Sequence, residues 1–161
     1  TMKIIDNFLD IEDFANIKNT MLNNNFSWYY QNNVSGINDE EPNAMYFTHI
    51  FYHNFEVRSD KFYIFKNLLT KIKAKALIRI KGNCYPRTDK LVHHKKHFDY
   101  PFKHRGLILY INNNDGFTII GDKKIESVEN RALFFDASVE HNSTNCTDKK
   151  ARFNVNINYY E

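Results

Sequence analysis

Three side chains in the second half of the sequence have the types and spacing needed to hold one metal ion. His97 and Asp99 are separated by a single residue, Phe98. On an extended backbone, residues two apart point to the same side and lie about 7 Å from one another, so both can reach one ion. His141 can supply a third ligand. Two neutral imidazoles and one carboxylate form the facial set that binds iron(II) and leaves the opposite positions open for a co-substrate and oxygen.

Arg152 follows His141 and opens the last predicted strand. A guanidinium is always charged and can bind a carboxylate with two hydrogen bonds. It suits the far carboxylate of a dicarboxylate whose 2-oxo acid end chelates the metal. An arginine at a strand start is commonplace, so this interpretation depends on its placement relative to the three ligands. His93 and His94 compete with His97, but neither has an acid two residues later.

The elements before this region are predicted to be partly helical. Lys3–Leu9 is expected to form a strand, and Asp10 is expected to cap a helix that ends at Asn23. A second helix is predicted from Ser59 or Asp60 onward. The apolar residues at helical spacing are Ile11, Phe14, Ile17, Met21 and Leu22 in the first helix, and Phe62, Phe65, Leu69, Ile72 and Ala76 in the second. Phe26–Gln31 and Ala44–Phe55 have the composition of β structure.

From Leu77 onward the hydrophobic period changes to two, which predicts a β-rich segment. Several short strands with turns between them indicate a sandwich or barrel. The predicted strands are Leu77–Tyr85, Leu91–Phe98, Gly106–Asn112, Gly116–Ile120, Lys124–Ile125, Ala132–Asp136 and Arg152–Tyr159. Without repeats or a linker, we expect a single domain over residues 1–161. Its helical support would span about residues 10–76 and its β core about residues 77–160.

The composition narrows the cellular context. The chain has 161 residues, of which 16% are aromatic, so it can bury one sizeable core. There is no apolar run long enough for a membrane span and no signal-peptide pattern at the start. We therefore expect a cytoplasmic protein, with Cys84 and Cys146 as free thiols.

Basic residues are concentrated between Arg87 and Arg105, around the predicted metal ligands. Such a segment favours an acidic substrate or a phosphate backbone. The simpler interpretation is a solvated loop. The formal net charge of +3 is too small to decide between them.

The sequence resembles the iron(II)/2-oxoglutarate-dependent oxygenases, above all the prolyl 4-hydroxylases of the small hypoxia-sensing and bacterial or viral type. The amino-terminal IIDNFLDIEDF, residues 4–14, is similar to the opening strand and helix of this group. The other residues that carry the resemblance are Cys84-Tyr85-Pro86, His97-Phe98-Asp99, Leu109-Tyr110-Ile111-Asn112, Arg131-Ala132-Leu133-Phe134-Phe135, His141 and Arg152.

The resemblance implies a mainly β fold, with a double-stranded β-helix (jelly-roll, cupin-like) core flanked by about two helices. It implies iron(II) bound by His97, Asp99 and His141, and 2-oxoglutarate held at its far carboxylate by Arg152 and Tyr110. Tyr85 would hydrogen-bond the co-substrate. Oxygen would be the second co-substrate, with ascorbate as a further candidate cofactor. The implied reaction hydroxylates an unactivated C–H, first of all that of a prolyl residue in a peptide or protein, and releases succinate and CO2.

The resemblance also suggests a bacterial or phage source, with the cytoplasm of a bacterium or of a virus-infected host as the location. The sequence departs from the family pattern at the long basic connection between Tyr85 and His97 and at the Asn113–Gly116 turn, where a Gly-Gly turn is frequent. Three alternatives stay open: a nucleic-acid-directed oxygenase that uses residues 87–105, a non-catalytic metal-binding domain of the same fold, and a zinc hydrolase. We expect a monomer or homodimer that binds no membrane.

Overall fold

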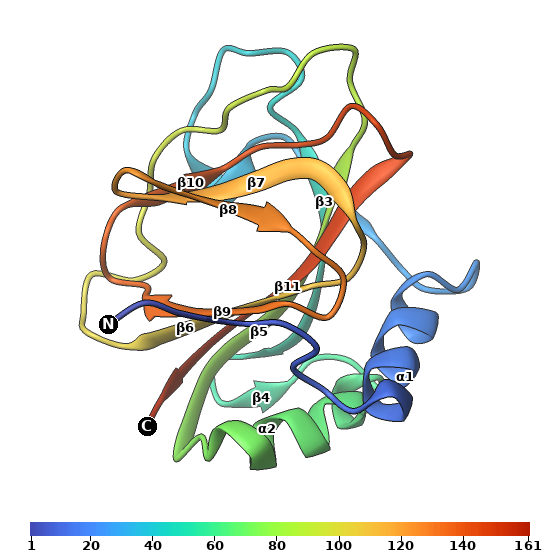
Figure 1. The fold of residues 1–161 in the computed structure, drawn as a ribbon, viewed down its shortest axis with the longest axis vertical. Helices are drawn as coiled ribbons and strands as arrows, with labels where there is room; N and C mark the ends of the chain where they lie inside the picture. Colours follow the sequence, from blue (N-terminus) through green and yellow to red (C-terminus); the bar gives the residue numbers. More distant parts are fainter.

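Antiparallel strands in two sheets form most of the protein, for which the computed structural model describes residues 1–161 (Figure 1). The larger sheet has the order β1 (Lys3–Ile5), β9 (Ala132–Asp136), β6 (Arg105–Tyr110), β11 (Ala151–Tyr160), β5 (Ala76–Pro86), β3 (Tyr46–His53) and β2 (Tyr29–Gln31). The short β4 (Glu56–Val57) also pairs with β3. The smaller sheet has the order β10 (His141–Ser143), β7 (Asn114–Ile120) and β8 (Lys123–Ser127).

The two sheets face one another, and the chain passes back and forth between them (Figure 1). Strand β6 belongs to the larger sheet, β7 and β8 to the smaller, β9 to the larger, β10 to the smaller and β11 to the larger again. This winding is that of a double-stranded β-helix. The predicted mainly β fold with a jelly-roll core and two flanking helices is therefore confirmed.

The helices α1 (Ile11–Met21) and α2 (Lys66–Ile72) pack against the outer face of the larger sheet (Figure 1). Their buried side chains, which include Phe14, Ile17 and Leu68, join the largest apolar cluster. Ile11 and Leu22 do not, because they are 83% and 40% exposed at the two ends of the first predicted stripe. The second helix begins with a 3-10 turn, η2 (Phe62–Phe65), and is shorter than predicted, since Ala76 already belongs to β5.

Strand β11 divides its side chains between the two faces of the larger sheet. Val155 and Ile157 belong to the apolar cluster under the helices. Asn154, Asn156 and Asn158 alternate with them and therefore point to the other face, between the sheets. All three asparagines are buried. The interior between the sheets is therefore lined by polar side chains along this strand.

The predicted strand Leu91–Phe98 is wrong. This segment lies in the long connection between β5 and β6 and forms only two isolated bridges, His93 with Thr144 and His97 with His141. No neighbouring strand runs alongside this segment over its length, so no continuous β-ladder forms. The strand β10 was missed, because its three polar residues owe their extended form to pairing with β7. No helix is long and apolar enough to cross a membrane, and both cysteines are free.

Candidate metal centre and anion pocket

The structure brings His97, Asp99 and His141 together, with one ligand atom of each within 4.8 Å of the others. His97 and Asp99 lie in the β5–β6 connection, and His141 is the first residue of β10. The His97 amide donates to the His141 carbonyl at 2.9 Å, and the His141 amide donates to the His97 carbonyl at 2.8 Å. The Asp99 amide donates to the carbonyl of Ala137 at 2.9 Å. Backbone hydrogen bonds therefore hold all three ligands in place.

Backbone carbonyls also select the same ring nitrogen in both histidines. Nδ1 of His141 lies 2.9 Å from the Val139 carbonyl oxygen, and Nδ1 of His97 lies 3.4 Å from that of Lys95. A proton on Nδ1 that points at a carbonyl leaves the lone pair on Nε2. Nε2 of His97 faces Asp99 Oδ1 at 4.0 Å. The two Nε2 atoms are therefore the nitrogen ligands that the site offers.

Asp99 is held as an ionised carboxylate by three donors. Arg79 Nη2 donates to Oδ1 at 3.1 Å, while the side-chain amides of Asn156 and Asn158 donate to Oδ2 at 3.0 and 2.8 Å. Burial acts to raise the pKa of Asp99, but the Arg79 guanidinium, followed by His141 and Lys81, holds that pKa well below its usual range. A carboxylate has about four lone-pair positions. One therefore remains on Oδ1 for a metal ion.

His97 is neutral at physiological pH, as a metal ligand must be. Burial, followed by the proximity of His141, lowers the pKa of His97 to about 4. Its Nε2 lies 2.9 Å from the hydroxyl oxygen of Ser35, which can donate to the lone pair. Ser35 belongs to the 3-10 turn η1 (Val34–Gly36) and has a left-handed φ of 57°. An ion on Nε2 must displace this hydrogen bond.

The donor set fits iron(II). It consists of two imidazoles and one carboxylate, which iron(II) binds on one face of an octahedron. Metal–ligand bonds of about 2.0–2.2 Å require ligand atoms closer together than the 4.8 Å limit found here. Small rotations of the side chains would bring them into range, since the backbone already places all three around one point.

Arg152 lies fully buried beside this cluster. Its Nε donates to Ser127 Oγ at 2.8 Å, Nη1 to the Thr144 carbonyl at 3.1 Å and Nη2 to Thr118 Oγ1 at 3.1 Å. No carboxylate lies within 4.0 Å of it. A buried charge without a counter-ion costs several kcal/mol. An anion bound beside the guanidinium would offset that cost.

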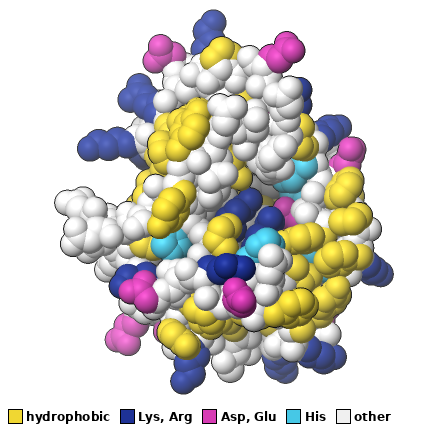
Figure 2. Space-filling view, turned by 180° about the vertical axis from the view of Figure 1, so that it is seen from behind, with side chains coloured by type: hydrophobic (Ala, Val, Ile, Leu, Met, Phe, Trp, Pro, Cys, Tyr) yellow, Lys and Arg dark blue, Asp and Glu magenta, His cyan; other side chains and the backbone are white.

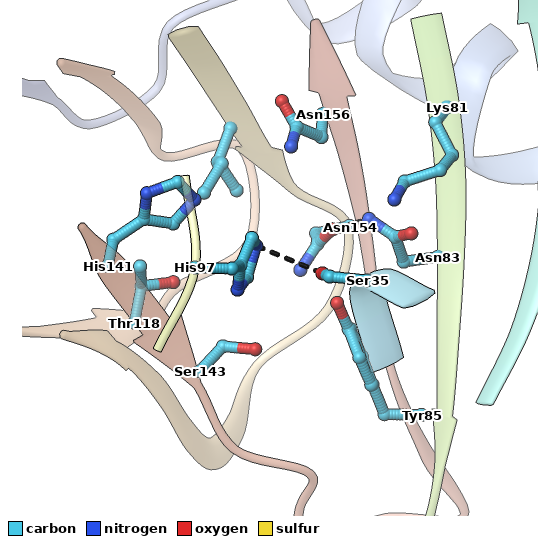
Figure 3. Close-up of a pocket in the computed structure, with 11 residues that line it drawn as sticks. Ser35, Lys81, Asn83, Tyr85, His97, Thr118, His141, Ser143, Asn154 and Asn156 are labelled. Carbon is cyan, nitrogen blue, oxygen red and sulfur yellow. Dashed lines mark hydrogen bonds between the residues drawn. The ribbon is translucent and has the colours of Figure 1, made fainter. Parts of the chain in front are cut away.

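A cavity of about 30 Å³ lies between the cluster and the surroundings of Arg152. Figure 3 shows its side chains, and Figure 2 shows a hollow near the centre of one face, with basic and histidine side chains in and around it. The lining residues are Ser35, Lys81, Asn83, Tyr85, His97, Ile108, Thr118, His141, Ser143, Asn154 and Asn156. Two of the three ligand residues and Thr118, a partner of Arg152, thus share one cavity.

No protein-family model matches the sequence, and no curated protein matches it. Solved structures do match. A prolyl hydroxylase from Trichoplax adhaerens, in complex with a hypoxia inducible factor oxygen degradation domain peptide fragment, is 13% identical with a TM-score of 0.71. The match covers 99% of this chain and 83% of that one. A 2OG-Fe(II) oxygenase family oxidoreductase from Burkholderia pseudomallei is 9% identical with a TM-score of 0.67, over 99% and 85% of the two chains.

The chain has the fold of the 2-oxoglutarate/iron(II)-dependent oxygenases. A prolyl-4-hydroxylase from Pseudomonas putida also shares this oxygenase fold, at 9% identity and a TM-score of 0.62, over 99% of this chain and 92% of that one. The epimerase SnoN of nogalamycin biosynthesis shares this fold as well. It is 11% identical with a TM-score of 0.67, and the match covers 99% of this chain and 77% of that one. Because these proteins include an epimerase as well as hydroxylases, the fold leaves the reaction and the substrate to be argued from the site.

Within this oxygenase fold, the two predicted tyrosines lie on either side of Arg152. Their ring centroids lie 5.3 Å (Tyr85) and 5.7 Å (Tyr110) from the guanidinium carbon. The Tyr110 hydroxyl donates to Thr118 Oγ1 at 2.8 Å, and the Tyr85 hydroxyl faces the cavity in Figure 3. Burial raises the pKa of both phenols, so both stay neutral donors. Tyr85 thus lies in the cavity wall, while the Tyr110 hydroxyl contacts Thr118, another lining residue.

Several lining residues were not singled out from the sequence: Ser35, Lys81, Asn83, Asn154 and Asn156. For Lys81, Asn83, Asn154 and Asn156, the sequence did contain a pattern that could have identified them. Arg152, Asn154, Asn156 and Asn158 alternate with apolar residues in β11, and Arg79, Lys81, Asn83 and Tyr85 do so in β5. Such polar alternation usually marks a solvent-facing side. Here both polar sides line the interior between the sheets, and only the fold reveals that.

The basic segment lies beside this site. Arg87, Lys90, Lys95, Lys96 and Lys103 are exposed, whereas Arg105 pairs with Glu161 at 3.1 Å. Exposed lysines in a connection are also what a solvated loop would show. Nucleic-acid binding by residues 87–105 therefore stays a prediction.

Proposed function

We propose that the protein is an iron(II)- and 2-oxoglutarate-dependent dioxygenase that hydroxylates an unactivated C–H bond. The observation that carries this proposal is a two-histidine, one-carboxylate cluster whose histidines line the same cavity as Thr118, a partner of the buried, uncompensated guanidinium of Arg152. A metal site alone would suit a zinc hydrolase equally well, but a hydrolase gives Arg152 no task. A dicarboxylate that chelates iron through its 2-oxo acid end needs both features.

His97, Asp99 and His141 would hold the iron. When bound, iron(II) with 2-oxoglutarate and oxygen supplies oxidative chemistry that yields succinate, CO2 and a hydroxylated product. Arg79, Asn156 and Asn158 keep Asp99 charged and fix its orientation. Burial keeps His97 neutral. The protein thus sets the protonation state of these two ligands before any ion arrives.

Arg152 would bind the far carboxylate of 2-oxoglutarate, and its fixed partners explain how it stays oriented. Ser127, Thr144 and Thr118 each accept one of its N–H groups, which leaves further donors for a ligand. Tyr85 would donate its hydroxyl hydrogen to the co-substrate from the cavity wall. The burial of Arg152 and Tyr85 limits the water that competes for these contacts.

A prolyl residue in a peptide or protein is the proposed substrate. It is supported by the structural likeness to prolyl hydroxylases, one of them solved with a peptide fragment. Ascorbate would serve to keep the iron reduced. A nucleic-acid-directed oxygenase would instead show a steep salt dependence of substrate binding, and a non-catalytic domain would form no succinate.

The test is succinate production from 2-oxoglutarate with iron(II), oxygen and ascorbate, measured with and without proline-containing peptides. Peptide hydroxylation adds one oxygen atom, which mass spectrometry detects. Asp99→Ala is the matched control, because it removes one ligand from an otherwise intact cavity. We expect turnover that this variant abolishes. Binding of 2-oxoglutarate by the metal-loaded protein without succinate under any condition would favour the non-catalytic alternative, and no binding at all would refute the proposal.

A further inference from the structure

The cavity is lined by a buried cation that the proposed function has not used. Lys81, in the middle of β5, is 8% exposed, and its ammonium group points into the cavity in Figure 3. No carboxylate lies within 4.0 Å of it. Its one hydrogen-bond partner is the Tyr46 hydroxyl, at a long 3.4 Å. Like Arg152, Lys81 is a buried positive charge without a counter-ion.

Lys81 lies at the metal end of the cavity. It pairs across the sheet with Asn156, whose amide donates to Asp99. The Tyr46 hydroxyl that Lys81 contacts also accepts from the amide of Ser35 at 3.3 Å, and the Ser35 hydroxyl contacts His97 Nε2. Lys81 is therefore two residues removed, through hydrogen bonds, from a ligand atom.

Arg152 contacts the cavity wall from behind, at Thr118 and Tyr85. It pairs with Tyr85, four residues further along β5 from Lys81. Four residues of strand span about 13 Å, so the two cations are anchored well apart along the larger sheet. A ligand that lies along this strand would therefore meet one cation near each end.

The charges of the site leave two positive groups unmatched. Arg79 is neutralised by Asp99 at 3.1 Å, while Lys81 and Arg152 have no acid. Burial, with Arg79 nearby, lowers the pKa of Lys81, which shows how poorly the protein alone supports its charge. A 2-oxo diacid carries two negative charges, one at each end. It would match both cations at once.

The amide groups around Lys81 are also incompletely satisfied. The side-chain oxygens of Asn83 and Asn156 are buried and have no hydrogen-bond partner. Buried polar atoms are normally paired with protein or with ordered water. These oxygens accept hydrogen bonds, which a carboxylate cannot donate, so ordered water beside a bound ligand would complete this end of the cavity.

We propose that Lys81 binds the carboxylate next to the 2-oxo group, so that the co-substrate is held by a cation at each end as well as by the metal. The proposal rests on the proposed function, because it takes the 2-oxo acid as the ligand. The group that Lys81 would bind is a carboxylate that lies beside the metal. An acidic group of the second substrate is the other possible source of that carboxylate.

The test compares two ligands on three variants. Isothermal titration of the manganese(II)-loaded protein without oxygen would measure the affinity for 2-oxoglutarate and for 2-oxobutyrate, which lacks the far carboxylate. We expect Lys81→Met to weaken both ligands roughly 10- to 100-fold, as the loss of a hydrogen bond to a charged group predicts. Arg152→Met should weaken 2-oxoglutarate alone. Lys66→Met, at an exposed lysine of α2, should change neither.

The stability of the ligand-free protein gives a second readout. Replacing an uncompensated buried cation by an apolar side chain of similar size is neutral or stabilising. Lys81→Met should therefore keep or raise the melting temperature, and the rise that 2-oxoglutarate causes should become smaller. A merely structural lysine would show the opposite change in the ligand-free protein. Lys81→Gln retains a polar group toward Tyr46 without the charge, and it should lose affinity as the methionine variant does.

The outcomes separate this proposal from the one on which it rests. If Lys81→Met and Lys81→Gln bind both ligands as the wild type does while Arg152→Met loses 2-oxoglutarate, the Lys81 proposal is overturned. The proposed function would then stand, and Lys81 would be left to an acidic group of the second substrate. If the wild-type protein binds neither ligand, the proposed function and the Lys81 proposal are both overturned.

Discussion

The buried His94 makes the stability of the metal-free protein depend on pH. Its ring is 2% exposed and stacks on Tyr85 with a centroid distance of 5.1 Å. Nδ1 lies 3.3 Å from Ser143 Oγ, and Nε2 has no hydrogen-bond partner. Burial, followed by the positive charge of Arg152, lowers the pKa of His94 from 6.5 to about 3. The native protein therefore holds this ring neutral under conditions in which the unfolded chain protonates it.

The sign and size of the effect follow from that difference. Between pH 6.5 and about 3 the unfolded state binds the extra proton, so the free energy of unfolding falls as the pH falls. At about 1.4 kcal/mol per pH unit, the whole interval amounts to about 5 kcal/mol. The part already lost at pH 4.5 is about 3 kcal/mol. His97 acts in the same direction, with its pKa lowered to about 4, so a variant is needed to isolate His94.

The variant His94→Phe keeps an aromatic ring against Tyr85 and removes the titrating group. Urea unfolding of the metal-free protein at pH 7 and pH 4.5 would give the loss of stability for each form. We expect the variant to lose about 3 kcal/mol less than the wild type over this interval. His93→Phe, at the exposed neighbouring position, is the matched control and should follow the wild type.

Equal losses for wild type and His94→Phe would refute this reasoning. They would mean that His94 is protonated in the folded protein at pH 4.5, and hence that water or an acid reaches its ring. The burial and the empty surroundings of Nε2 described above would then be wrong. The part of the loss that both forms share reflects other groups, such as His97, and only the difference between the two forms reports on His94.

Three further predictions follow from single contacts. Ser35→Ala removes the hydroxyl that occupies the metal-facing nitrogen of His97, so manganese affinity measured by titration should rise about 2- to 10-fold. Gly116→Ala would place a methyl group 2.6 Å from Cδ of Arg152, so it should lower the free energy of unfolding by about 1–3 kcal/mol and weaken 2-oxoglutarate binding, as urea unfolding and calorimetry would show. Burial raises the pKa of the Cys84 thiol to about 12, so a thiol reagent at pH 8 should modify it only after unfolding, which absorbance would follow.

The sequence could predict the elements whose own residues specify them. The apolar spacing of Phe14, Ile17 and Met21 fixes α1, and the alternation along 151–160 fixes β11, since each pattern buries one face. The segment 91–98 shows the limit. Its residues allow an extended strand, but a strand also needs a continuous neighbour, and this segment pairs with another one only in two isolated bridges, at His93 and at His97. Whether a neighbouring strand is present depends on the tertiary fold and cannot be read from residues 91–98 themselves.

The residues of the candidate site also fall into those that the sequence could identify and those that only the fold reveals. His97, Asp99, His141 and Arg152 could be selected because each residue type has a specific chemical use and their order along the chain is informative. Their roles stay predictions until metal and ligand binding are measured. Lys81 could not be selected, because a lysine in an alternating strand ordinarily faces solvent. Only the closure of the two sheets shows that this side is the interior.

The reciprocal hydrogen bonds between the backbones of His97 and His141 have a consequence for motion. The connection that carries His97 is tied to the smaller sheet at few points, so a fluctuation that lifts it away separates both histidines at once. An ion shared by the two rings would oppose that opening with its full binding free energy. Metal occupancy should then be visible as slowed hydrogen exchange at these two amides, far more than at the helices behind the larger sheet.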